Sequence, residues 1–114
     1  MNIIGKWLSD DGVELIIRSI TKNTINGILR SKGKFLLDEK KFNGVILKKD
    51  TDEVIFSFYL KIKVNTKNDF DYLISLGTIN GEKRKISLTI AKFHFHHNQK
   101  IPVRIERFDL RHKG

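Results

Sequence analysis

The fold of this chain is decided by residues 5–20, Gly-Lys-Trp-Leu-Ser-Asp-Asp-Gly-Val-Glu-Leu-Ile-Ile-Arg-Ser-Ile. Two apolar stretches, each alternating with polar residues, flank the segment Asp10-Asp11-Gly12. Alternation with a period of two is typical of β-strands, and a short Asp/Gly-rich segment between two such runs is typical of a turn. These residues therefore predict the first hairpin of a small antiparallel β-barrel.

The same alternation recurs along the rest of the chain, and helical periodicity is nearly absent. The predicted strands cover residues 3–9, 13–21, 24–31, 41–49, 53–64, 70–79, 83–96 and 101–111. The single proline, Pro102, lies at the start of the last strand, where a strand tolerates it. Hairpin-length connections between eight strands predict an all-β, eight-stranded antiparallel up-and-down barrel.

Two connections are distinctive. Asn80-Gly81 predicts a tight two-residue hairpin turn, because both residues adopt positive φ readily. The segment between Ser31 and Phe42 has no clear alternation, and we interpret it as a loop over one end of the barrel.

Composition limits the possible classes of protein. A chain of 114 residues fits one domain, residues 1–114, and it has no cysteine, so no disulfide is expected. No signal-peptide pattern and no apolar run of membrane-spanning length is present. We expect a cytoplasmic protein without a membrane partner.

The net charge is strongly positive, with 22 Lys and Arg against 13 Asp and Glu, a net +9. Such a charge favours contact with an acidic protein or a nucleic acid. The cations lie in short separate groups, such as Lys40-Lys41, Lys48-Lys49 and Lys83-Arg84-Lys85, and solvated strand faces and turns explain them as well as a binding surface does.

Side chains that carry catalysis are not grouped in a known pattern. His94, His96 and His97 raise the question of a metal site, because residues two apart on a strand project to one side. No third ligand stands at a recognisable spacing, the aspartates fall in predicted turns, and the serines lack His and Asp partners. We expect no metal, no cofactor and no enzymatic activity.

The order of these segments resembles the avidin and streptavidin family. Gly5-Lys6-Trp7 with Ser9-Asp10 and Gly12 is similar to the family's first strand and turn. Further similar segments are Asn26-Gly27-Ile28-Leu29 in the third strand, Phe56-Ser57-Phe58 through Ile62-Lys63 in the fifth, and the turn Asn80-Gly81. The resemblance implies a calycin-type barrel that binds a small molecule. It also implies that an arginine of the last strand, Arg104 or Arg107, stacks on the indole of Trp7.

Most biotin-binding residues of that family have no counterpart here. Trp7 is the only tryptophan, Leu29 stands where the resemblance implies a tyrosine, and Ile62 stands at a tryptophan position. Ser9 and Ser31 remain as hydrogen-bonding groups. We therefore expect a ligand other than biotin.

Two functions are compatible with these observations. In the first, the barrel holds a small, largely apolar ligand in a cavity lined by Trp7, Ser9, Leu15, Leu29, Ser31, Phe58 and Ile62. In the second, the barrel is filled by side chains, and its basic exterior binds an acidic protein or a nucleic acid. Several strands are apolar on both faces, for example at Ile55 and Tyr59, so a covered outer face and a homo-oligomer are expected in either case.

Overall fold

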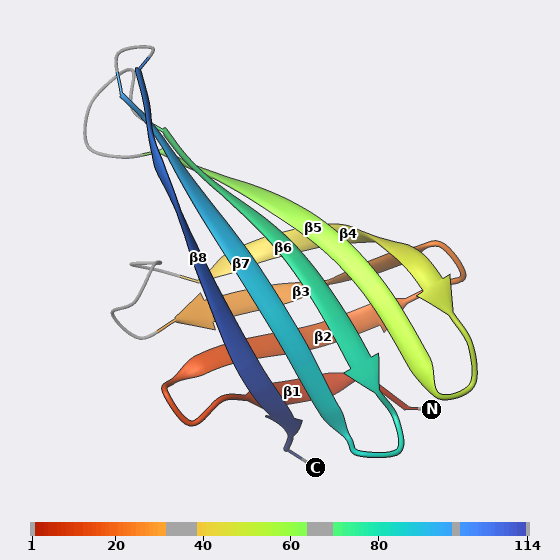
Figure 1. Cartoon of the computed structure of the whole chain (residues 1–114). Helices are drawn as coiled ribbons and strands as arrows, with labels where there is room; N and C mark the ends of the chain where they lie inside the picture. The colour runs from red at the N-terminus through yellow and green to blue at the C-terminus, as the bar shows by residue number, and fades with distance from the viewer. Residues whose placement is uncertain (1, 32–38, 64–69, 97–98, 114) are drawn as a thin grey trace.

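The eight strands of the chain close into one barrel in the computed structural model (Figure 1). The structure describes residues 2–31, 39–63, 70–96 and 99–113, without the side chains of 95–96 and 99–103. The strands are β1 (Gly5–Leu8), β2 (Val13–Ile20), β3 (Thr24–Ser31), β4 (Lys40–Lys49), β5 (Glu53–Lys63), β6 (Phe70–Asn80), β7 (Lys85–His96) and β8 (Gln99–His112). Each pairs antiparallel with the next, and β8 pairs with β1, so the predicted up-and-down topology is confirmed.

The period-two alternation of the sequence places one face of each strand inside the barrel. Along β5 the inward residues are Val54, Phe56, Phe58 and Leu60, all buried, and the residues between them are more exposed. Residues directly opposite on neighbouring strands share a face, so Phe56, Gly77, Leu88 and Phe108 form one inward row across β5 to β8. The core is made of such rows.

Two inward glycines make room for large aromatic side chains. A Cβ atom on Gly77 would lie 2.2 Å from Cζ of the buried Phe56, and one on Gly27 would lie 3.0 Å from Cε2 of Phe42 and 1.8 Å from the carbonyl oxygen of Ile16. The rings of Phe42 and Phe58 stack with their centroids 4.3 Å apart. Side chains therefore fill this part of the barrel.

The strands differ in length, and this gives the barrel two unlike ends. β5 to β8 extend well past β1 to β3 at the end that carries the β1–β2, β3–β4, β5–β6 and β7–β8 connections, which we call the upper end (Figure 1). The opposite end, the base, carries the other three turns and both ends of the chain. No helix among the described residues is long and apolar enough to span a lipid bilayer.

The turn between β6 and β7 differs from the prediction. Asn80 pairs with Lys85, so four residues, not two, connect the strands, and among the described residues positive φ occurs only at Gly5, Gly12 and Arg84. The side chain of Asn80 accepts a hydrogen bond from the Lys83 amide at 3.0 Å. Asn80 thus closes a longer turn through its side chain. Most of the segment predicted as a loop after Ser31, residues 32–38, lies outside the described residues.

Candidate functional site

Trp7 closes the base of the barrel. Its indole N–H donates to the carbonyl oxygen of Ile3 at 3.0 Å, and its ring stacks on the imidazole of His112, with centroids 4.4 Å apart. His112 also contacts the carbonyl oxygen of Ile4 through Nε2 and the guanidinium of Arg84 through Nδ1. The side chain that covers Trp7 therefore comes from the last strand, and it is a histidine.

The prediction of Arg104 or Arg107 at this position is wrong. Both side chains are exposed: Arg104 pairs with Glu106 at 2.8 Å, and Arg107 bonds to Ser87 and Asp109. The register explains the difference, because Trp7 lies opposite His112 on β8, and the two arginines lie at least five residues earlier on that strand.

Ser9, predicted as a ligand contact, belongs to the β1–β2 turn. Its hydroxyl donates to Oδ1 of Asp11 at 2.6 Å and accepts from the Val13 amide at 2.9 Å. The backbone amide of Ser9 donates to the Val13 carbonyl at 2.9 Å. The hydroxyl is therefore already engaged in holding the first hairpin.

The other predicted lining residues all lie on inward faces and belong to one hydrophobic core, with Ile62 packed against it. Leu15 and Leu29 are adjacent to Trp7 in a single row across β1 to β3, and both are fully buried. Phe58 stacks on Phe42, and Ile62 packs at the edge of the core toward the upper end of β5. These four side chains serve as core packing.

Two inward hydroxyls are buried without a hydrogen-bond partner in the described part of the chain: Oγ of Ser31 and Oγ of Ser75. Ser75 is 0 % exposed and Ser31 is 7 % exposed. Ser31 was predicted from the sequence, and Ser75 was missed. The missed signal is positional: Ser75 shares the inward face of β6 with Leu73, Gly77 and Ile79, where an apolar residue is expected.

A charged group lies on the inward face of β6 and β7 near the upper end. Asp71, at the edge of burial, contacts Nδ1 of His94 through Oδ1 and Nζ of Lys92 through Oδ2, the latter at 3.4 Å. The structure thus pairs His94 with a carboxylate, and His96 and His97 fall outside the described side chains. No group of three His, Cys, Asp or Glu side chains that could hold a metal occurs among the described residues.

Two pockets lie away from the upper end. One, of about 470 Å³, is at the base between the N-terminal residues and the β4–β5 and β6–β7 turns, with Trp7 in its wall. The other, of about 370 Å³, lies between the β2–β3 turn and the end of β4.

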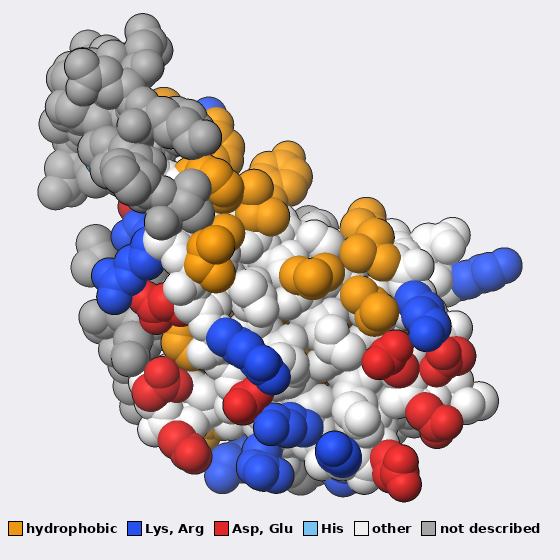
Figure 2. Space-filling model, in the orientation of Figure 1, with side chains coloured by type: hydrophobic (Ala, Val, Ile, Leu, Met, Phe, Trp, Pro, Cys, Tyr) orange, Lys and Arg blue, Asp and Glu red, His pale blue; other side chains and the backbone are white. Residues whose placement is uncertain are grey.

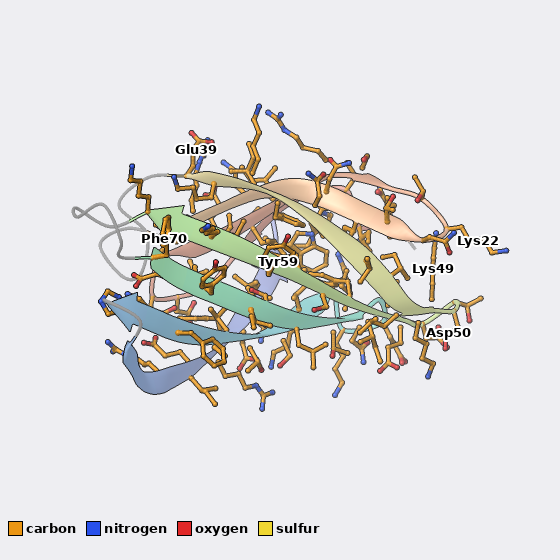
Figure 3. The ribbon with its side chains drawn as sticks, turned by 90° about the horizontal axis from the view of Figure 1, so that it is seen from above. Lys22, Glu39, Lys49, Asp50, Tyr59 and Phe70 are labelled. Carbon is orange, nitrogen blue, oxygen red and sulfur yellow. The ribbon has the colours of Figure 1, made fainter. Side chains whose placement is uncertain are left out.

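The β4–β5 turn beside these pockets is held by Asp50. The amides of Glu53 and Asp52 donate to its carboxylate and lower its pKa. Hydrogen bonding and charge attraction from Glu53, with attraction from Asp50, raise the pKa of the Lys48 ammonium. Lys22, Lys49 and Asp50 lie at this end, opposite Phe70 and Glu39 (Figure 3).

The outer face of the long strands is apolar. Tyr59, Ile74, Ala91 and Ile105 are directly opposite one another across β5 to β8 and form an outward row without a charge. Tyr59 is 69 % exposed and Ile105 is 67 % exposed. Apolar side chains gather on this face, with charged ones grouped elsewhere on the view (Figure 2). We call these four residues the outer row.

The sequence matches no protein-family model and no curated protein, whereas the structure is similar to solved structures of shwanavidin. Apo shwanavidin aligns with a TM-score of 0.55 over 99 % of this chain and 100 % of that chain, at 13 % identity. A low-affinity mutant of shwanavidin aligns with a TM-score of 0.56 over 100 % and 98 %, at 13 % identity. The complex of a shwanavidin mutant with biotin aligns with a TM-score of 0.55 over 99 % of both chains, at 16 % identity. This chain therefore has the avidin-like fold, an eight-stranded closed antiparallel barrel.

Proposed function

We propose that this protein is a non-enzymatic binding protein whose barrel holds a small, largely apolar ligand with a polar group. The observation that carries the proposal is that the buried hydroxyls of Ser31 and Ser75 lack a partner among the described residues, on inward faces that are mostly apolar. A buried hydroxyl without a hydrogen bond costs about 1–3 kcal/mol. A ligand that bonds to either hydroxyl recovers part of that cost on binding.

The fold supports the same proposal by analogy. A shwanavidin mutant of the same fold has been solved with biotin bound. Biotin is not the expected ligand here, since Trp7 is the only tryptophan and it is stacked on His112 at the base. Leu29 and Ile62 are apolar where the family resemblance implies a tyrosine and a tryptophan.

The test is thermal unfolding of the purified protein with biotin and then with a panel of small apolar compounds that each carry one polar group. A ligand that binds only the folded state raises the apparent midpoint of unfolding. The variant Ser75→Ala is expected to gain about 1 kcal/mol of stability without ligand, because it removes the unpaired hydroxyl. It is also expected to bind the active compound more weakly.

The matched control is Ser87→Ala, which removes a serine hydroxyl from an outward position of β7, where it accepts a hydrogen bond from the exposed Arg107. It should change neither the stability nor the affinity for the active compound.

If no compound stabilises the protein and Ser75→Ala destabilises it, the barrel is filled. Function would then lie on the basic exterior, and binding of an acidic protein or nucleic acid that weakens steeply with salt would identify it.

We also propose that the protein forms a homo-oligomer through the outer row. A folded monomer seldom leaves a contiguous apolar surface of this kind exposed to water. The row is free of charge on a chain of net +9, so two copies can meet there without placing cations of the row against each other. The molar mass in solution, by light scattering at micromolar concentration, tests this; a monomer mass would overturn it.

A further inference from the structure

The charged group of Asp71, Lys92 and His94 lies on the face of β6 and β7 that points into the barrel, not on the outer face. Asp71 is opposite His94, and Leu73 is opposite Lys92, so these side chains share the inward face with the buried Leu73 and Ile90. Asp71 is the most enclosed of the three, with 12 % of its side chain exposed against 34 % for Lys92 and 30 % for His94. Charged side chains on an inward face near the core need a reason beyond solvation.

The carboxylates of this region are already neutralised. Both oxygens of Asp71 are engaged, one by His94 and one by Lys92. From β8, Glu106 pairs with Arg104 at 2.8 Å. An ammonium group has three N–H donors, and Asp71 is the one ion-pair partner of Lys92 among the described residues. The group therefore presents N–H donors to an incoming molecule, whereas its carboxylates are already paired with cations.

The charged group is continuous with the unpaired hydroxyl of Ser75. Ser75 lies opposite Ile90, and Lys92 follows two residues along β7, about 7 Å further toward the upper end. Between the two positions on β6 and β7 lie Leu73 and Ile90, which are apolar and buried, whereas on β8 the paired Glu106 and Arg104 are opposite Ile90 and Lys92. A molecule that reaches both polar positions must therefore have an apolar body.

We propose that Lys92, positioned by Asp71 and with His94 beside it, binds an anionic end group of the ligand, so that the barrel selects an apolar acid. This inference rests on the proposed ligand-binding function and names its ligand class. Charge-assisted hydrogen bonds to a carboxylate are stronger than those between neutral groups. The net charge of +9 also raises the local concentration of an anion near the protein.

The experiment uses three probes with the same eight-carbon body and different end groups: octanoate, 1-octanol and octylamine. Binding is measured by thermal unfolding and by calorimetric titration at neutral pH. Octanoate is expected to bind at least tenfold more tightly than 1-octanol, and octylamine is expected to bind least. Lys92→Met, which keeps an unbranched side chain one atom shorter and removes the charge, should lower octanoate affinity about tenfold and leave 1-octanol affinity unchanged.

The chain offers a closely matched control in Lys85→Met. Lys85 is on the same strand, is also 34 % exposed and also pairs with an aspartate, Asp109, but it alternates with the buried Ile86 and so lies on the outward face. Its substitution should leave octanoate affinity unchanged. Lys92→Arg, which keeps the charge, should retain selectivity for octanoate and guards against a Met variant that folds poorly.

Each other outcome overturns the inference in a recognisable way. Equal affinity for octanoate and 1-octanol would refute selection of an acid and leave the proposed ligand-binding function standing. Tighter binding of octylamine would make Asp71 the recognition group. An equal loss of octanoate binding in Lys92→Met and Lys85→Met would show that octanoate responds to the net charge of the protein and not to a site at Lys92. Absence of binding by all three probes, together with silence across the wider panel, would refute the proposed function as well.

Discussion

At the residue scale, Trp7 is held by groups from both ends of the chain: the Ile3 carbonyl accepts its indole N–H, and the ring of His112 covers its face. The burial of Trp7 was predictable, because alternation alone puts it on the inward face of β1. The identity of its partner was not predictable from alternation. That identity depends on the register between β1 and β8, which are separated by almost the whole chain, and the resemblance to avidins pointed to an arginine instead.

His112→Ala is expected to destabilise the protein by about 1–2 kcal/mol, since a stacked aromatic pair contributes about 0.5–1.5 kcal/mol beyond the area it buries. The emission of Trp7, the only tryptophan, should move to longer wavelength as water reaches the ring. Chemical denaturation followed by tryptophan fluorescence measures both effects.

Two variants make this prediction specific. His112→Phe keeps a ring over Trp7 and should recover most of the stability. Arg111→Ala, at the neighbouring exposed position, should leave the emission of Trp7 unchanged. Unchanged emission in His112→Ala would contradict the stacking assignment.

At the element scale, strands were predicted to within about two residues at most ends, whereas turn geometry was predicted less well. Period-two patterns are local, so each strand can be predicted from a few residues of its own sequence. The Asn80-Gly81 turn depended on how far β6 and β7 pair, and their pairing stops at Asn80 and Lys85. The prediction of the site is limited in the same way by what is local. Ser31 was found from its face on β3, whereas the lack of a hydrogen-bond partner for Ser75 depends on neighbours from other strands.

The β1–β2 hairpin provides a prediction at this scale. Ser9→Ala removes both the bond to Asp11 and the bond from the Val13 amide, and it should destabilise the protein by about 1–2 kcal/mol. Because the hydroxyl is engaged in the turn, ligand affinity should change much less than in Ser75→Ala. Thermal unfolding with and without ligand separates the two effects. A large loss of ligand affinity in Ser9→Ala with unchanged stability would indicate instead that Ser9 contacts the ligand.

At the scale of the whole molecule, the outer row requires knowledge of four strands at once. The sequence indicated that β5 is apolar on both faces, and only the pairing brings Tyr59, Ile74 and Ile105 into one line. Ile74 and Ile105 were not singled out in advance, since each stands alone in its own strand pattern. Figure 3 shows Tyr59 near the middle of the long β5 strand.

Tyr59→Lys is expected to weaken self-association at least tenfold, because it places a cation in a charge-free row that two copies share. Sedimentation equilibrium across the micromolar range measures the change. Ile4→Lys is the control, since Ile4 is also an exposed apolar residue but lies at the base, where its carbonyl oxygen contacts His112. An equal effect of both substitutions would indicate general charge repulsion instead of a defined interface.

The closure of the barrel brings the two ends of the chain together at the base, where the Lys113 amide donates to the Lys6 carbonyl at 2.8 Å. Ser75 and Lys92 lie further along the strands, toward the opposite end. A tag or a surface linker joined to either terminus would therefore attach the molecule at its base. The proposed ligand-binding residues would then lie away from the point of attachment, which makes this barrel well oriented for immobilisation in a sensor.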